Sequence, residues 1–221
     1  MQFEHSLGIL ADALMLTYED KLNRDTQWAL EEGGMYFERR SAVHDTLTRL
    51  TKSLDELGID YAVAGAMAMF LHGFRRFTEV VVILVTKQGL AEIHEALEGR
   101  GYVKLFAASK NLRDATNGVK IDFILSGQFP GDGKPGPVSF PVPDEVAVLQ
   151  DGIRVVSLPK LIELKLASGQ AAHRLKDLGD VQQLIVELKL PLEIAEQLDP
   201  SLRDAYRRIW EGAQSGDSNE F

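Results

Sequence analysis

The sequence has 221 residues, a formal net charge of −9 and a pI near 5.1. This length suits one large domain or a domain with an appended helical part, and the acidity argues against a protein that coats nucleic acid generally. The chain has no cysteine, which excludes a disulfide framework, a thiol nucleophile and a cysteine-based zinc site.

The N-terminal part is expected to be helical. Apolar residues at helical spacing predict a helix over residues 1–15 that packs on the body or on a second copy of the chain. Residues 18–40 are expected to wrap as helix and loop. A further apolar stripe predicts a helix over 41–57, with Ser41 as its N-cap and Gly58 as its stop.

The stretch from residue 61 to 85 organises the chain. It predicts a short buried strand, a tight turn at Gly65, a helix of small and apolar residues, a basic loop and a second strand over 80–85. The β-branched run of that second strand suits burial on both faces. Because glycine lets backbone N–H groups approach a ligand at the start of a helix, the turn favours an anion such as phosphate.

Two hairpins are expected further along the chain. After a helix over 87–100 and a strand over 102–107, Asn117-Gly118 predicts a hairpin between residues 112–114 and 119–125. Asp151-Gly152 predicts a second hairpin in the same way.

The remaining segments are a loop and a helical tail. Glycine and proline dominate residues 126–144, which predicts a surface loop over or beside the cleft. Leu158-Pro159 is expected to open a helical tail that continues to Trp210. A chain with no basic leader and no long apolar run is expected to be cytoplasmic and away from membranes.

Several motifs in the central stretch resemble nucleotidyltransferases of the polymerase-β superfamily, including the AbiEii-type toxins. These motifs are Gly65-Ala66, His72-Gly73, Arg75, Thr78 and the hydrophobic strand that follows them. In that family the strand reads Asp-x-Asp, and the aligned positions here are Val80 and Val82.

Residues two apart on a strand share a face, so two aspartates would point at one metal–phosphate site. Valine offers Mg²⁺ no oxygen donor, and Glu79 has the opposite parity and is expected to point away.

The resemblance implies further site residues. Asp122 would be the third carboxylate and the remaining metal ligand, although a lone acid on an apolar strand otherwise turns to solvent. Lys165 on one tail helix would neutralise triphosphate charge, and Asp177 or Asp180 on the next helix would position groups around it. Alternatively, these two aspartates pair with Arg174 and Lys176 on their own helix. The implied nucleotide-binding residues are Gly65, Ala66, Arg75, Arg76, Lys165, Lys176, Asp177 and Asp180.

The implied fold class is α/β (α+β): a nucleotidyltransferase fold whose small mixed sheet is flanked by helices, with an N-terminal helical extension and C-terminal helices. The expected parts are a helical segment over 1–57, an α/β core over 58–157, a helical part over 158–212 and a flexible tail over 213–221.

Three functions follow from these patterns. The first is Mg²⁺-dependent transfer of a nucleoside monophosphate from an NTP to a hydroxyl on tRNA or on a protein, with Asp122 and Lys165 as catalytic residues. That activity would be lost or strongly impaired because both metal-ligand aspartates are valine. The second is a non-catalytic nucleotide-binding or protein-interaction module, a pseudoenzyme. The third is a plain α/β interaction domain with no nucleotide site.

Partners follow from the same resemblance. A toxin–antitoxin relationship implies an antitoxin-like protein partner. An RNA acceptor would need a local basic patch, for which the candidates are Arg75, Arg76, Lys110, Arg113 and Lys120.

The resemblance also suggests how activity would have been lost. Because the replacements by Val80 and Val82 are confined to the two metal-ligand positions, the pattern favours recent or deliberate inactivation over long decay.

Overall fold

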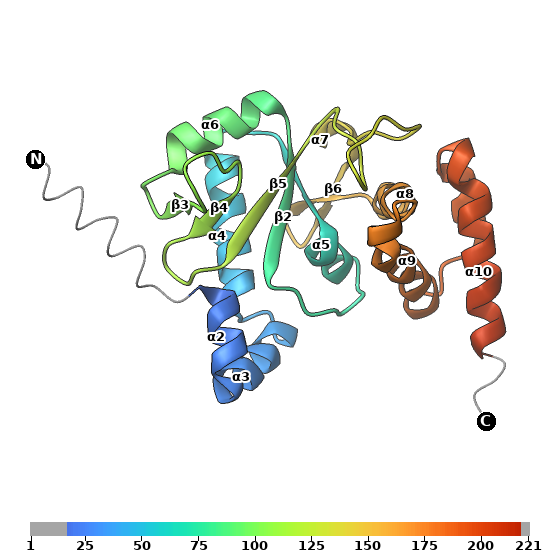
Figure 1. The fold of residues 1–221 in the computed structure, drawn as a ribbon, viewed down its shortest axis with the longest axis horizontal. Helices are drawn as coiled ribbons and strands as arrows, with labels where there is room; N and C mark the ends of the chain where they lie inside the picture. Colours follow the sequence, from blue (N-terminus) through green and yellow to red (C-terminus); the bar gives the residue numbers. More distant parts are fainter. Residues whose placement is uncertain (1–16, 218–221) are drawn as a thin grey trace, which may run out of the picture.

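A computed structural model describes residues 17–217 of the chain. The helix predicted over 1–15 and the last four residues lie outside this range. None of the helices within it is long and apolar enough to span a bilayer. Figure 1 shows a central sheet, with the first helices at one end of the molecule and the last helices at the other.

A buried carboxylate joins the first three described helices, which are α2 (Tyr18–Arg24), α3 (Thr26–Phe37) and α4 (Ala42–Glu56). Glu32 accepts hydrogen bonds from the Tyr18 hydroxyl at 3.1 Å and from the Ala42 N–H at 2.7 Å. The predicted N-cap is confirmed, because the Ser41 hydroxyl accepts from the His44 N–H. Gly58, at φ +68°, follows the end of α4 as predicted.

The core is a mixed sheet of seven strands in the described residues, in the order β3-β4-β5-β2-β1-β7-β6. The strands are β1 (Tyr61–Ala64), β2 (Val80–Val85), β3 (Tyr102–Lys104), β4 (Leu112–Asp114), β5 (Lys120–Leu125), β6 (Ala147–Gln150) and β7 (Ile153–Val156). β2 runs antiparallel to β1 and parallel to β5, so the sheet is mixed at its centre.

Both predicted hairpins are confirmed. β4 pairs antiparallel with β5, and β6 pairs antiparallel with β7. The turn of the second hairpin places Asp151 and Gly152 at φ +52° and +81°, which is the conformation that this dipeptide favours. The strand expected over 102–107 is shorter than predicted, because the chain turns after Lys104.

Helices surround the sheet. They are α5 (Gly65–Leu71), α6 (Lys87–Leu97), α7 (Pro143–Val146), α8 (Leu158–Ser168), η1 (Ala172–Arg174), α9 (Leu175–Glu187), η2 (Leu192–Gln197), η3 (Pro200–Leu202) and α10 (Arg203–Asp217). Figure 1 shows α8, α9 and α10 side by side at the C-terminal end. Residues 213–217, assigned to a tail from the sequence, continue α10 instead.

The end of α8 packs tightly on α9 through a glycine. A Cβ added at Gly169 would lie 2.4 Å from Cδ2 of Leu178 and 3.2 Å from the Lys165 carbonyl oxygen. At Gly179, on the exposed side of α9, nothing lies within 4 Å of an added Cβ. The two glycines therefore form a matched pair for substitution.

We expect Gly169→Ala to lower the free energy of unfolding by roughly 1–3 kcal/mol, because Leu178 must move out of its packed position. Gly179→Ala is expected to raise it by about 0.5–1 kcal/mol, because alanine is the better residue in an exposed helix. Urea denaturation of both variants measures the difference. Equal effects would show that α8 and α9 are not packed at Gly169.

Candidate functional site

A cleft of about 880 Å³ lies where four parts of the fold meet. The turn from β1 into α5 and the loop that leads into β2 supply one side. The glycine- and proline-rich loop, here residues 126–142, and the facing ends of α8 and α9 supply the other. The sequence placed this loop over or beside the cleft, and its residues 128–133 do line the cleft.

The floor of the cleft is one face of β2 and β5. Val81 and Ile83 point into the core and are fully buried, whereas Val80 and Val82 alternate to the other face and line the cleft. The parallel register pairs Val82 with Asp122 and places Lys120 beside Val80.

An ion pair lies on β5 beside these valines. The Lys120 ammonium nitrogen is 2.9 Å from one carboxylate oxygen of Asp122 and 3.0 Å from the other. Both side chains keep a little under a third of their surface exposed. Residues two apart on a strand share a face, so lysine and aspartate are held together by the geometry of β5 alone.

Gly65 is in the conformation that the predicted turn requires. Its φ is +64°, which favours glycine, and an added Cβ would lie 3.1 Å from Cγ2 of Val82. The turn therefore packs directly on Val82, which lines the cleft. Gly65 and Ala66 both line the cleft, as predicted.

A network of ion pairs lines the side of the cleft formed by α8 and α9. The Lys165 ammonium lies 2.6 Å from Asp180 and 3.2 Å from Asp177, and it is almost fully buried. Asp180 also forms an ion pair with Arg76 from the basic loop. These contacts link α8, α9 and the loop before β2. Of the pairs expected as the alternative, Arg174–Asp177 is observed, whereas Lys165 rather than Lys176 supplies the other lysine contact.

Asp177 has three partners of its own. It accepts hydrogen bonds from the Ser168 hydroxyl at 2.7 Å and from the Arg174 Nε at 2.9 Å, besides its contact with Lys165. Burial would raise the pKa of the Asp177 carboxyl, but Lys165, Ser168 and Arg174 together hold that pKa below its usual value. Asp177 is therefore an anion that the fold has already neutralised.

Several other predicted residues lie in different places. Arg75 is exposed and does not line the cleft, whereas its neighbour Arg76 does. Lys176 lines the cleft as predicted and is exposed. Glu79 also lines the cleft, so the expectation that it points away is wrong: it lies in the bend before β2, where strand parity does not apply. The His72 ring nitrogen Nε2 lies 2.8 Å from the Val156 carbonyl oxygen.

The candidate RNA-binding cations are largely paired. Arg76 pairs with Asp180, Arg113 with Glu19 at 2.7 Å, and Lys120 with Asp122. These partners reduce the charge that the proposed basic patch could offer to a phosphate backbone.

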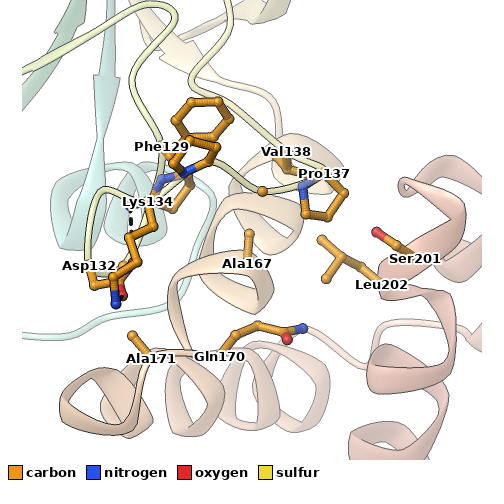
Figure 2. A pocket seen from close by; sticks show the side chains of 14 residues that line it. Phe129, Asp132, Lys134, Pro137, Val138, Ala167, Gln170, Ala171, Ser201 and Leu202 are labelled. Carbon is orange, nitrogen blue, oxygen red and sulfur yellow. Dashed lines mark hydrogen bonds and ion pairs between the residues drawn. The ribbon is translucent and has the colours of Figure 1, made fainter.

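The glycine-rich loop separates the cleft from a second hollow of about 310 Å³, which Figure 2 shows between the loop, the end of α8 and η3. Residues 129–132 line both spaces. The base of the loop is fixed by two backbone hydrogen bonds of 2.8 Å, from Gly127 to Phe140 and from Phe140 to Gln128.

The cleft residues do not fit a divalent metal. Mg²⁺ requires several oxygen ligands in near-octahedral geometry. Val80 and Val82 present only methyl groups to the cleft, and Asp122, which forms an ion pair with Lys120, is not among the residues that line it. Across residues 17–217 no group of three or more acidic or histidine side chains is placed to hold a metal ion. The expectation that Asp122 binds Mg²⁺ has no support from its surroundings.

Sequence reasoning missed two contributors. Lys120 was considered only as part of a basic patch, although Lys-x-Asp on one strand already places both side chains on one face. Ser168, which donates to Asp177, lies one turn after Lys165 on α8 but was not considered.

No family model matches the sequence, and a search of curated proteins finds no significant match. Among solved structures, the chain is similar to a candidate nucleotidyltransferase from Thermotoga maritima, with 19% identity over 62% of this chain and 91% of that chain and a TM-score of 0.44. It is also similar to the antibiotic-resistance factor ANT(2'')-Ia, with 13% identity over 79% of this chain and 97% of that chain and a TM-score of 0.47. A nucleotidyltransferase-like protein from Paracoccidioides brasiliensis has 16% identity over 74% of this chain and 91% of that chain, with a TM-score of 0.41. At these low identities and scores, the function must be argued from the residues of this chain.

We expect Asp177→Asn to lower the free energy of unfolding at pH 7 by on the order of 3 kcal/mol, because Lys165 and Arg174 lose a buried anionic partner. A lowered carboxyl pKa stabilises the fold above the unfolded value, 3.8, and that stabilisation is lost as the pH falls below it. The difference between wild type and variant should therefore shrink below about pH 4. Denaturation curves at pH 7, 5, 4 and 3 measure it.

The matched control is Asp204→Asn, which removes the same charge from an exposed ion pair on α10. We expect its effect to stay below about 1 kcal/mol at every pH. A gap between wild type and Asp177→Asn that stays constant with pH would contradict the assignment.

Proposed function

We propose that this protein binds a nucleotide in its cleft, on a nucleotidyltransferase fold, and that it transfers nucleotides very slowly or not at all. The observation that carries the proposal is the floor of the cleft, where Val80 and Val82 lie beside the Lys120–Asp122 ion pair. This floor offers valine methyl groups where a metal site would need oxygen donors, while the Gly65 turn lines the same cleft.

The size and charge of the cleft support binding. Its volume of about 880 Å³ lies within the range of small-molecule sites. Its charged lining side chains are Arg76, Lys110, Lys165, Arg174, Lys176, Glu79, Asp132, Asp177 and Asp180. Five are cationic and four anionic, so the cleft has a formal charge of +1 in a chain of −9. An anionic ligand is therefore attracted to this place on an otherwise acidic protein.

The cationic side chains of the cleft differ in whether an aspartate already pairs with them, and this difference suggests their roles. Lys165 and Arg76 are already held by buried aspartates, so we assign them to positioning α8, α9 and the basic loop. Arg174 is half exposed but also pairs with Asp177, whereas Lys176 is exposed and lines the cleft. Lys176 is therefore the proposed phosphate contact.

The absence of transfer follows from charge. In-line displacement at a nucleotide α-phosphate requires cations that neutralise both the attacking and the leaving oxygen, a role that paired metal ions fulfil. With valine at both positions of β2 and a lysine on Asp122, the chain cannot assemble that pair. The proposal therefore favours the non-catalytic module among the functions that the sequence allowed.

We expect at least one of ATP, CTP, GTP and UTP to raise the melting temperature, by several degrees at about a hundred times its Kd, because a ligand bound only by the folded state stabilises it by about 2.7 kcal/mol. Lys176→Met should reduce the shift. The control is Lys87→Met, which removes the same charge from an exposed position on α6 outside the cleft. If none of the four nucleotides changes the melting temperature, the plain interaction domain is the better description.

We expect no label transfer from radiolabelled NTPs to total tRNA or to cell protein by the wild-type chain with Mg²⁺. Val80→Asp/Val82→Asp should show transfer, because two carboxylates on one face of β2 then join Asp122. Val80→Asn/Val82→Asn is the matched control, of similar size and polarity but without anionic ligands. Transfer by the wild type would contradict the proposal.

A further inference from the structure

We propose that Phe140 and Gln128 form a nucleobase subsite in the cleft, so that its ligand is a nucleoside polyphosphate and not an inorganic polyphosphate. The inference rests on the proposed function and deepens it, because it names the part of the ligand that the glycine- and proline-rich loop contacts. Lys176 keeps its role at the phosphates.

The first step concerns the aromatic side chains of the cleft. Three phenylalanines line it, Phe77, Phe129 and Phe140. The Phe77 ring already meets the Tyr36 ring, with centroids 4.9 Å apart. Across residues 17–217, neither of the other two rings has an aromatic or cationic partner. Phe129 also lines the smaller hollow of Figure 2, whereas Phe140 lines the cleft and not the hollow. Phe140 is therefore the ring that a ligand in the cleft can use.

The second step concerns how Phe140 is held. Its side chain is half-buried, packs against the hydrophobic core and lines the cleft. Its backbone N–H donates to the Gln128 carbonyl oxygen at 2.8 Å, and its carbonyl oxygen accepts from the Gly127 N–H at 2.8 Å. Backbone and ring are thus held in place without a ligand, which lowers the entropy cost of stacking a base on the ring.

The third step concerns the amide beside this ring. The hydrogen bond from Phe140 places Gln128 directly across the base of the loop. The Gln128 side chain is exposed and lines the cleft, and within the part of the chain that the structure describes its amide makes no hydrogen bond. A glutamine amide both donates and accepts, and it pairs with the edge of adenine in nucleic-acid complexes. A ring and an unpaired amide therefore suit the face and the edge of a base.

The fourth step concerns the distance from the anion-binding turn. Gly65 packs on Val82 of β2, and Ile124 lies on the neighbouring strand β5 two residues further along. One strand across and two residues along is a step of roughly 8 Å. Ile124 lines the cleft, and Gln128 follows soon after β5 ends, with its N–H bonded to the Leu125 carbonyl oxygen. The cleft thus offers an anion-binding turn at one place and a base-binding pair at another, which is the order of groups along a nucleotide.

The test is calorimetric titration of the full chain with ATP, CTP, GTP, UTP and inorganic tripolyphosphate. We expect at least one nucleotide to bind about tenfold more tightly than tripolyphosphate, which has no base to stack. Phe140→Leu should weaken that nucleotide about tenfold, equivalent to about 1.4 kcal/mol, and leave tripolyphosphate within about twofold of wild type. The matched control is Phe106→Leu, because Phe106 is 66% exposed and does not line the cleft.

A second variant tests the amide without touching the core. Gln128→Leu keeps the size of an exposed side chain and removes its hydrogen bonds, so we expect it to weaken the same nucleotide severalfold and to leave tripolyphosphate unchanged. Gln183→Leu, at an exposed position of α9 outside the cleft, is its control. Lys176→Met should weaken nucleotide and tripolyphosphate alike, because both carry the phosphates.

Three results would contradict the inference. Equal losses of nucleotide and tripolyphosphate affinity in Phe140→Leu would mean that the ring only shapes the cleft. Unchanged nucleotide affinity in both Phe140→Leu and Gln128→Leu would place the base elsewhere. Tripolyphosphate bound as tightly as all four nucleotides would rule out a base subsite and leave the phosphate role of Lys176 intact. If the wild type binds none of the five ligands, the proposed function itself fails and the nucleobase subsite fails with it.

Discussion

The parallel register between β2 and β5 is the constraint on which the cleft depends. It places Val80 and Val82 beside Lys120 and Asp122 on one face and leaves Val81 and Ile83 to the core on the other. A shift of one residue would exchange the two faces and bury a charged pair. The hydrophobic core therefore fixes which side chains the ligand meets.

A second set of interactions holds the helical wall against this floor. Lys165 joins α8 to α9 through two aspartates, and Arg76 connects the loop before β2 to the same cluster. Such buried pairs contribute little net stability compared with apolar packing, but losing one partner is costly. Here they join α8, α9 and the loop before β2, all of which line the cleft.

The elements that the sequence predicted well are those that local chemistry specifies. Ser41 caps α4 and both Gly-containing turns form hairpins, because each depends on a few neighbouring residues. The pairing of Asp177 with Arg174 followed from their spacing of three on one helix, whereas the contact of Lys165 with Asp177 and Asp180 depends on how α8 and α9 pack and was not predicted. The partner of Asp122 was missed, although the strand alternation contained it. Glu79 was misplaced because strand parity was applied to a residue outside the strand: β2 starts at Val80 as predicted, and Glu79 lies in the bend before it.

The loop over residues 126–142 is a shared wall, with the cleft on one side and the smaller hollow of Figure 2 on the other. Gly131 within it sits so close to α8 that an added Cβ would lie 3.1 Å from the Ser168 carbonyl oxygen. A molecule that displaces this wall from one side alters the space on the other. Thermodynamic linkage then requires the coupling to be reciprocal: an occupant of the small hollow would change the affinity of the cleft by the same factor as the reverse.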